Sequence, residues 1–456
     1  MNTLIAIAGL GIVCLVAEIF NLRKAIVPVT IIGLLGIFGL NWADYGTTAT
    51  FYNNMVVIDK YGVSFSALFI LLTIFLVALS PDFHKEHKTK ISDFVAIKLF
   101  LLAGAVAMVN FGNLAMFFLG IEILSISLYV LAASQPKDVK SNEAGMKYFL
   151  MGAFASGILL FGIALIYGAT GTFDIALIFE AVVSQNIPQW FFIGIVLLTI
   201  GLLFKIAAVP FHFWAPDVYE GSPALSTATM STLAKVAAMA AFFKLMRSMN
   251  QEVPGTYMTI ISIAAILSMT VGNLMALRQD NVKRMLAFSG ISHAGFMLMV
   301  FFNPPLTSGI LLYYAAAYAF AGIAAFAVIL FVAEKSENEH IYNFNGLGKT
   351  NPLMAAVLTC SLLSMAGIPI FSGFFAKMFL FEKVLATGHV AIVIVAVINS
   401  IISVGYYFKL ILAMYGKEAT GEKRNVPVMY SIVAVLAIVL NIAMGLYPSF
   451  VADLMR

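Results

Sequence analysis

Charged residues and cysteines are both scarce in this chain of 456 residues. Only 11% of the residues are charged and 62% are hydrophobic, whereas soluble domains have about 25% and about 45–50%, respectively. The two cysteines, Cys14 and Cys360, form no CxxC pattern, so we expect neither a disulfide framework nor a metal site from them. With a mean hydropathy of +0.99, the sequence predicts an all-α polytopic membrane protein.

Motifs that bind cofactors are missing as well. No GxGxxG follows a strand, no P-loop is present, and the cysteines do not cluster. His84 and His87 lie in a lysine-rich loop, where we expect no metal site. We therefore expect the chain itself to bind no metal, no redox cofactor and no nucleic acid. Such a chain can move something across a membrane, but redox chemistry must come from other proteins.

Long apolar segments follow one another along almost the whole chain. A helix needs about 20 mostly apolar residues to cross roughly 30 Å of hydrocarbon. This criterion predicts about fourteen membrane helices, although thirteen or fifteen also fit, because the second segment is short and the fourth and fifth nearly fuse. The predicted spans are 2–21, 25–41, 61–80, 91–109, 111–133, 143–168, 188–217 (broken), 222–247, 256–277, 281–302, 306–333, 352–386 (broken), 389–415 and 428–448.

The basic residues of the loops predict the orientation of the chain. Most loop Lys and Arg residues follow odd-numbered spans, as Arg23, Lys24, Lys85 and Lys137 do. Because cytoplasmic loops carry an excess of Lys and Arg, these loops are predicted to be cytoplasmic. Both termini are then expected on the outer side of the membrane.

The stretch Gly201–Pro223 departs most from a plain membrane helix. Its sequence, GLLFKIAAVPFHFWAPDVYEGSP, holds a lysine, three prolines, a histidine and two acids. Pro210 cannot donate a backbone hydrogen bond and clashes with the preceding turn, so the helix must kink or break there. A carbonyl freed inside a membrane is tolerated only beside protein or water. Together with Lys205, which is costly in hydrocarbon, the break predicts a wet path inside the protein.

A second break is predicted at SMAGIPIFSGFFAK (Ser364–Lys377), in a span that runs in the opposite direction. FGNL (Phe111–Leu114) and VGNL (Val271–Leu274) give a further short match between the halves. Paired broken helices indicate two inverted repeats. We therefore divide the single membrane domain, 1–456, into N-terminal helices (1–90), a first repeat (91–247), a second repeat (248–415) and a C-terminal helix (416–456).

Several ionisable side chains lie far from the ends of the predicted spans, on different helices at similar depth. Such groups usually face the bundle interior and mark ion or proton paths. Burial disfavours the charged form of lysine, so a buried lysine can lose and regain a proton near neutral pH. With one acid against three lysines, H⁺ is expected as the conducted species rather than Na⁺. The side chains are Glu122, Lys205, Lys235, His293 and Lys377.

Static roles stay open for some of these residues and their neighbours. Lys235 could be a fixed ion-pair partner, His293 a satisfied core residue, and His212 a cap for the carbonyls freed by the break. Lys98 and Lys409 lie within about two turns of cytoplasmic span ends, where long side chains can reach the interface. We favour that role for Lys98. A movable pairing of Glu122 with Lys205 would instead switch the proton affinity of Lys205.

Four motifs resemble one protein family. They are GLLFK followed by PFHFWAPDVYEGSP (Pro210–Pro223), MKYFLMGAFASGILLFG (Met146–Gly162), NVKRMLAFSGISHAGF (Asn281–Phe296) and SMAGIPIFSGFFAKMFLF (Ser364–Phe381). Together they resemble the antiporter-like membrane subunits of respiratory complex I and of multisubunit cation/proton antiporters. The resemblance covers roughly residues 90 to 448.

Within that family, the chain is similar to the N-type members. PDVYEGSP after PFHFW has the N-type form, and no long lateral helix of the L-type follows the last span. The M-type carries a glutamate where this chain has Lys377. The predicted fourteen spans match the bacterial form of the N-type.

Carried over by position, the resemblance implies a proton path. The matching positions are the fifth-helix glutamate Glu122, the broken-helix lysine Lys205 that it modulates, the connecting lysine Lys235, the terminal lysine Lys377 of the outward half-channel, the central polar residues His212 and His293, Tyr406 near the exit, and the basic residues Lys147 and Lys409.

The resemblance further implies a proton-translocating membrane subunit of an NADH–quinone oxidoreductase in a bacterial inner membrane. NADH, FMN, iron–sulfur clusters and quinone would then be bound by partner subunits. An M-type antiporter-like subunit and small K-, J- and A-type subunits are the expected membrane partners. The alternative functions are a subunit of a stand-alone cation/proton antiporter and a passive structural spacer in the same complex.

Overall fold

The computed structural model describes residues 1–455 except for 88–90, 184–186, 250–254, 335–337 and 419–423. Twelve helices within these residues are long and apolar enough to cross a membrane. They are α1 (Asn2–Ile19), α2 (Arg23–Ala43), α3 (Lys60–Ala78) continuing into α4 (Ser80–His87), α5 (Ile91–Val109), α6 (Leu114–Ala132), α7 (Val139–Thr170), α11 (Ala224–Thr229) with α12 (Lys235–Met249), α13 (Gly255–Leu277), α14 (Val282–Leu298), α15 (Pro304–Ala333), α19 (Val390–Gly416) and α20 (Val428–Leu446).

Two broken helices complete the bundle. The first consists of α9 (Trp190–Lys205) and α10 (Trp214–Gly221), and the second of α17 (Pro352–Ala366) and α18 (Ser372–Leu385). The predicted all-α membrane fold with two broken helices is therefore confirmed. The count of about fourteen spans stays a prediction, because it depends on counting each broken helix as one span.

Each break begins with a residue in the left-handed backbone region, which ends an α-helix. Ala207 has a φ of +58° after α9, and Gly367 has a φ of +86° after α17. In both cases the residue directly after the left-handed one donates its amide to a carbonyl five residues earlier, from Ala208 to Leu203 and from Ile368 to Leu363. The two breaks therefore have the same local geometry, and Ala207 in the first break corresponds to Gly367 in the second.

The same succession of helices occurs twice along the chain. In the first repeat α5, α6 and α7 precede α9–α10 and α11–α12, and in the second repeat α13, α14 and α15 precede α17–α18 and α19. Asn113 caps α6 by accepting from the amide of Met116, and Asn281 caps α14 by accepting from the amide of Arg284. Each cap residue also bridges to the segment after the third helix of its own repeat, Asn113 to Asp174 and Asn281 to His340.

Close helix contacts give the register of the repeats and correct one prediction. A Cβ on Gly104 would lie 2.7 Å from the amide of Leu124, and a Cβ on Gly272 would lie 2.7 Å from the amide of Ser292. Gly104 thus corresponds to Gly272, and the FGNL and VGNL motifs are not equivalent. FGNL precedes α6, whereas VGNL lies inside α13, so the three letters that they share, GNL, were a chance match.

The predicted connections contain short elements that the hydropathy pattern does not reveal. Strands β1 (Ala49–Phe51) and β2 (Val56–Ile58) form an antiparallel hairpin. The remaining elements are α8 (Ile175–Val183), α16 (Leu347–Thr350), α21 (Ser449–Ala452), a π-helical segment at Met230–Ala234, and 3₁₀ segments at Met299–Phe302, Ile341–Phe344 and Asp453–Met455.

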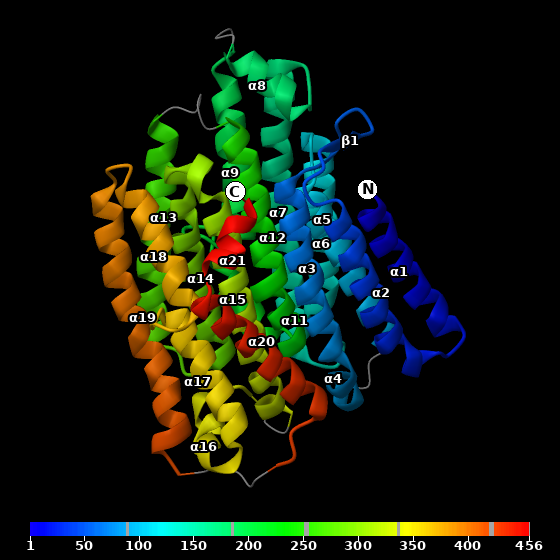
Figure 1. Cartoon of the computed structure of the whole chain (residues 1–456), viewed down its shortest axis with the longest axis vertical. Coiled ribbons are helices and arrows are strands. Elements are labelled where there is room, and N and C mark those ends of the chain that lie inside the picture. The colour runs from blue at the N-terminus through cyan, green and yellow to red at the C-terminus, as the bar shows by residue number, and fades with distance from the viewer. Residues whose placement is uncertain (88–90, 184–186, 250–254, 335–337, 419–423, 456) are drawn as a thin grey trace.

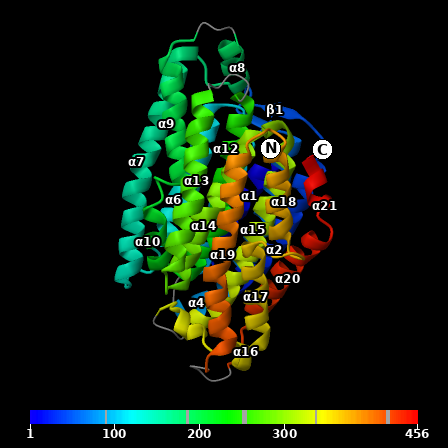
Figure 2. The ribbon, with the colours of Figure 1, turned by 90° about the vertical axis from the view of Figure 1, so that its left-hand side faces the viewer.

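The bundle has two clearly different ends. Figure 1 shows α8 and β1 at one end, here called the α8 end, and α4 and α16 at the other, called the α16 end. Both chain termini lie toward the α8 end. In the view of Figure 2, α7 and α9 lie along one side of the bundle and α20 and α21 along the other, with α15 between them.

Burial separates the inner helices from the outer ones. The spans of α14 and α15 are buried throughout, whereas α1 and α2 expose most of their apolar side chains, as expected for a surface that faces lipid. Lys98 was predicted to reach the membrane interface, and this prediction is wrong. Its side chain is 2% exposed, and its Nζ donates to the carbonyl of Leu76 and to Ser80 Oγ where α3 ends.

Candidate functional site

Lys205 and Glu122 are linked through serine hydroxyls rather than by a direct ion pair. Lys205 Nζ donates to Ser125 Oγ at 2.7 Å and to Ser156 Oγ at 3.1 Å. Ser156 Oγ in turn donates to Glu122 Oε1 at 2.6 Å. A hydroxyl both donates and accepts hydrogen bonds, so it can carry a proton between the ammonium and the carboxylate. The predicted pairing therefore takes the form of a hydroxyl-bridged chain from α6 through α7 to α9.

A small cavity lies between Lys205 and Lys235. Its walls include Ser125, Tyr148, Trp214 and Tyr219, and its volume is about 10 Å³, room for roughly one water molecule. Lys235 Nζ lies 5.9 Å from the ring centre of Tyr219. Within the part of the chain that the structure describes, neither that ammonium nor the Tyr219 hydroxyl has a hydrogen-bond partner, and both are buried. Two unpartnered polar groups around one cavity make it a suitable place for a proton-carrying water.

The backbone around Lys235 is arranged to bring its ammonium to the second repeat. A π-helical segment directly precedes Lys235, and such segments are frequent at functional sites. The ammonium lies where Gly290 of α14 leaves space, because a Cβ there would be 2.6 Å from Lys235 Nζ and 3.0 Å from the Tyr318 hydroxyl. Lys235 thus reaches across the boundary between the repeats.

His293 continues the line inside the second repeat. Its Nδ1 is 2.9 Å from the Tyr314 hydroxyl, and its Nε2 is 3.4 Å from the Tyr407 hydroxyl, which also bonds Ser289 Oγ. A second small cavity adjoins His293, Tyr314 and the end of α17. The imidazole can accept at one nitrogen and donate at the other, so it joins the tyrosines on its two sides.

Lys377 lies after the second break and binds the backbone that the break frees. Its Nζ donates to the carbonyls of Ala366 at 3.0 Å and Met365 at 3.3 Å, and to Ser400 Oγ at 3.0 Å. The ammonium also lies 4.8 Å from the ring centre of Phe296, a favourable cation–π distance. The side chain is 4% exposed. The second buried lysine of a broken helix is therefore stabilised without a carboxylate.

Tyr406 and Lys409 lie on α19, further toward the α16 end. The Tyr406 hydroxyl donates to Asn273 Oδ1 at 3.1 Å, and Asn273 Nδ2 donates to the carbonyl of Asn399. Lys409 Nζ donates to Asp280 Oδ1 at 2.8 Å and to the carbonyl of Gln279. The hydrogen bond from Lys409 holds the pKa of the Asp280 carboxyl below its usual value.

Two predicted site residues lie apart from this line. Lys147 pairs with Glu143 at 2.7 Å and with Asp217 at 3.3 Å, at an exposed cluster that includes Arg284. His212 is buried in the first break, and its Nδ1 has no hydrogen-bond partner among the residues described. In the described part of the chain, no hydrogen bond connects Lys147 or His212 to this line.

The line of neighbours itself is formed by five of the predicted residues, Glu122, Lys205, Lys235, His293 and Lys377. Glu122 is joined to Lys205 through Ser156, and Lys205 and Lys235 line one cavity. The Tyr318 hydroxyl borders the same space at Gly290 as Lys235 Nζ, and its ring centre lies 4.8 Å from that of His293. Phe296 lies between His293 and Lys377, 6.1 Å from the imidazole centre and 4.8 Å from Lys377 Nζ.

Trp214, rather than His212, caps a carbonyl freed by the first break. Its indole nitrogen donates to the carbonyl of Phe204 at 3.0 Å, and its ring stacks on Tyr148 at 4.5 Å between centres. The capping role considered for His212 is therefore taken, at this carbonyl, by Trp214, which was not considered for it from the sequence. The signal was present, since an indole N–H inside an apolar segment must find an acceptor when it is buried.

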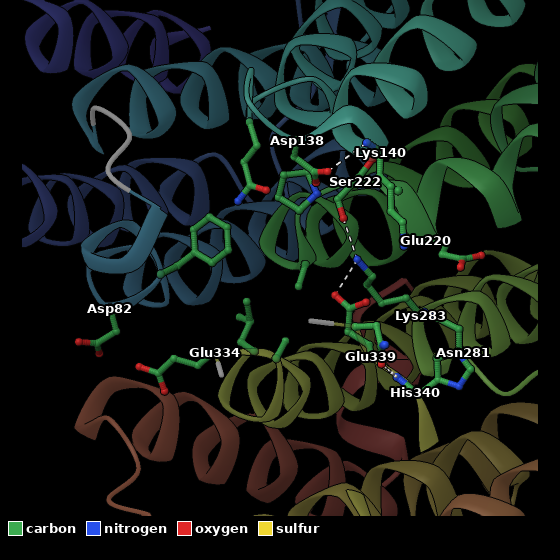
Figure 3. Close-up of a pocket in the computed structure, with 18 of the residues that line it drawn as sticks. Asp82, Asp138, Lys140, Glu220, Ser222, Asn281, Lys283, Glu334, Glu339 and His340 are labelled. Carbon is green, nitrogen blue, oxygen red and sulfur yellow. Dashed lines mark hydrogen bonds and ion pairs between the residues drawn. The ribbon is translucent and has the colours of Figure 1, made fainter. Parts of the chain in front are cut away.

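A larger cavity opens at the α16 end of the bundle. It measures about 250 Å³, and its charged lining includes Asp82 of the N-terminal helices, Glu220 of the first repeat and Glu334 of the second. Figure 3 shows Lys283 between Ser222 and Glu339 on its wall. Lys283 is 3% exposed, donates to the carbonyl of Ser222 at 2.9 Å and pairs with Glu339 at 2.8 Å.

Sequence reasoning missed Lys283 and most of the bridging hydroxyls. Lys283 lies at the start of the predicted span 281–302 and was not singled out, although it is buried on α14. Ser125 and Ser156 lie in apolar helices, where a serine hydroxyl can also satisfy itself on the backbone carbonyl four residues earlier. Ser125 does so with Ile121 as well as accepting from Lys205. Tyr219 and Tyr318 are buried aromatic side chains, which can equally serve packing alone. Only the fold decides which hydroxyls face the lysines.

The arrangement is suited to proton transfer and offers little to a metal. Among the described residues, no three His, Cys, Asp or Glu side chains come close enough to hold a metal ion. What the site offers is a row of lysines, a histidine and hydroxyls joining two oppositely directed broken helices. The fold and this row define the class: an antiporter-like polytopic membrane protein with inverted repeats.

Comparison with known proteins places the chain within that class. Residues 112–403 match the family model described as NADH:quinone oxidoreductase/Mrp antiporter, TM. The chain is 68% identical over 463 residues to a Flavobacterium johnsoniae protein named NADH-quinone oxidoreductase subunit N, with 100% of each chain covered. The chain therefore belongs to the NADH-quinone oxidoreductase subunit N family.

Solved structures show the same fold. A chain of respiratory complex I from Thermus thermophilus matches with a TM-score of 0.86 and 29% identity, covering 99% of this chain and 98% of that one. A chain of the Mrp complex from Dietzia sp. DQ12-45-1b matches with a TM-score of 0.88 and 22% identity, covering 99% and 95%. The likeness to the Mrp complex concerns the fold alone.

Proposed function

We propose that the chain is a proton-translocating membrane subunit of an NADH–quinone oxidoreductase. The observation that carries the proposal is the line Glu122–Ser156–Lys205, Lys235, His293 and Lys377, which joins the two broken helices through the buried middle of the bundle. Protons would enter at the α16 end, pass along this line and leave through the second repeat at the α8 end. Tyr406 and Lys409 would act beside it.

Other assignments follow from the same proposal. The chain would lie in a bacterial inner membrane with the α8 end and both termini outward. The matched helix order supports a division into 1–90, 91–247, 248–415 and 416–456. As a non-redox subunit, the chain would leave NADH, FMN, iron–sulfur clusters and quinone to its partners. An M-type subunit and K-, J- and A-type small subunits would be its membrane neighbours.

A subunit of a stand-alone cation/proton antiporter is the second candidate, since the Mrp fold matches. The high identity to a subunit N protein over the full chain favours the oxidoreductase. Purification of the native complex distinguishes the two functions. The proposal predicts that flavin and iron–sulfur subunits copurify with this chain, and an isolated antiporter assembly without them would contradict it.

The test of proton transfer uses assembled Lys205→Ala and Glu122→Ala complexes in sealed vesicles. We expect NADH-driven proton uptake to fall roughly tenfold or more in Lys205→Ala, because removing a proton-transfer group typically has effects of that size or larger. A native gel establishes assembly first. A passive spacer would leave the protons pumped per electron unchanged in both variants, and that result would contradict the proposal.

A further inference from the structure

A lysine near the end of the last helix occupies a matching place in each repeat. In the first repeat Lys244 of α12 donates to the carbonyl of Val109, where α5 ends and the link to α6 begins. In the second repeat Lys409 of α19 donates to the carbonyl of Gln279, in the link between α13 and α14. Each lysine thus holds the link between the first and second helices of its own repeat.

Each of these lysines also pairs with one carboxylate. Lys244 Nζ lies 3.2 Å from Asp59 Oδ2, and Lys409 Nζ lies 2.8 Å from Asp280 Oδ1. Asp280 belongs to the link itself. Asp59 comes from outside the repeat and caps α3, because its Oδ1 accepts from the amide of Gly62. Lys409 was among the predicted site residues, whereas Lys244 was not.

The two pairs lie at opposite ends of the bundle and differ in burial. Val109 and Asn110 adjoin β2 at the α8 end, where the amide of Val57 bonds the carbonyl of Asn110. Asp280 bonds Ile341 at the α16 end. The side chain of Lys244 is 16% exposed and that of Asp59 is 32% exposed, whereas the values for Lys409 and Asp280 are 39% and 67%. Water screens the second pair far more than the first.

The location of each pair matters if protons enter through the first repeat and leave through the second. The first repeat must then be closed at the α8 end, and the second at the α16 end, or protons would cross without doing work. A fixed ammonium is an effective closure, because it has no lone pair to accept a proton and its charge repels one. Fixed positive charges exclude protons and cations from other membrane pores in the same way.

We propose that Lys244, held by Asp59 and the carbonyl of Val109, is the charge barrier that closes the first repeat at the α8 end. Lys409 with Asp280 is its weaker counterpart at the α16 end. The centre of the Phe111 ring lies 5.5 Å from Lys244 Nζ, within the range of a cation–π contact. This inference rests on the proposed function, because a barrier has a purpose only where a proton path exists.

The experiment measures passive proton leak in sealed vesicles that contain the assembled complex without NADH. Lys244→Gln keeps a hydrogen-bond donor for Val109 but leaves the Asp59 carboxylate unpaired, which attracts protons. Lys244→Arg keeps the charge. We expect leak to rise about tenfold in Lys244→Gln, the change produced by one unit charge at roughly 10 Å and an effective dielectric constant of about 20, and to stay near wild type in Lys244→Arg.

Asp59→Asn is the matched control, because asparagine caps a helix about as well as aspartate. It leaves the lysine charge in place, so we expect leak at or below the wild-type value. Equal behaviour of Lys244→Gln and Lys244→Arg, whether tight, leaky or unassembled, would overturn the proposal. If Lys244→Gln alone fails to assemble, the charge serves folding, and the proposal is also overturned. A leak above the wild-type value in Asp59→Asn would overturn it as well.

Two further measurements separate this inference from the proposed function. Lys409→Gln should leak less than Lys244→Gln, since its pair is more exposed, and a larger leak there contradicts the inference. Lys205→Ala is measured with NADH in the same vesicles. Normal pumping in Lys205→Ala refutes the proposed function, whereas impaired pumping there with a tight Lys244→Gln refutes the barrier alone.

Discussion

The two repeats share a scaffold but stabilise their buried lysines in different ways. In the first repeat Lys205 precedes the break and reaches the Glu122 carboxylate through serine hydroxyls. In the second repeat Lys377 follows the break and binds two freed carbonyls and a serine. The first lysine is thus coupled to a group that can itself change charge, whereas the second is coupled to neutral dipoles that cannot.

The register of the repeats extends this contrast. Asn113 corresponds to Asn281 and Gly104 to Gly272, so the place of Glu122 in the first repeat is taken by Gly290 in the second. The space that a carboxylate would fill there is used by the ammonium of Lys235. The difference indicates that charge control is built into the first repeat, and that the second repeat passes on a proton it receives.

The largest expected effect comes from removing this difference. Gly290→Glu places a carboxylate beside Lys235, where it would stabilise the ammonium and hold its proton. We expect NADH-driven proton uptake by the assembled complex to fall roughly tenfold, the scale of a lost proton-transfer group. Gly290→Gln has nearly the same shape without the charge and should pump distinctly better. Equal pumping by the Glu and Gln variants would mean that steric crowding, not charge, matters at this position.

A smaller effect is expected where the backbones of the two breaks are compared. Gly367 has a φ of +86°, and a Cβ there would lie 3.1 Å from Lys377 Cδ. Gly367→Ala should therefore destabilise the protein by about 1–2 kcal/mol, the cost of the left-handed conformation for a residue with a side chain. Thermal unfolding of the purified complex measures this, and an unchanged midpoint would contradict it.

The reverse substitution in the first break should have the smallest effect. Ala207 already has a φ of +58°, so Ala207→Gly relieves the unfavourable conformation while increasing the freedom of the unfolded chain. The two contributions oppose each other, and we expect a gain of less than about 1 kcal/mol. A clear loss of stability in the same thermal assay would show that the Ala207 methyl group packs more favourably than its backbone conformation costs.

Hydropathy and proline placement were sufficient to predict most of the fold. The predicted spans 91–109 and 352–386 match α5 and the α17–α18 pair closely, because lipid leaves few alternatives to a helix. The β-hairpin around Ala49–Ile58 was missed, since strands of three residues have too little pattern to recognise. FGNL was paired with the wrong segment because the three shared letters, GNL, carry little information, whereas the true register depends on contacts between helices.

The site was predictable in its ionisable members and not in their connections. Buried lysines are costly, so Lys205, Lys235 and Lys377 stood out in the sequence. Lys98 shows the limit of that reasoning. It was assigned to the interface from its distance to a span end, yet the turn between α3 and α4 supplies it with buried acceptors. Serine and tyrosine hydroxyls gave no signal, because apolar helices tolerate them without any function.

Lys98 also provides the most direct test of the central claim. Lys98 and Lys377 are both buried lysines that donate to one serine hydroxyl and to backbone carbonyls, one for Lys98 and two for Lys377. Only Lys377 lies on the line between the broken helices. The decisive measurement is the number of protons pumped per electron by assembled Lys377→Met and Lys98→Met complexes. The account predicts a clear loss in Lys377→Met and a wild-type ratio in Lys98→Met. Equal ratios in the two variants would contradict it.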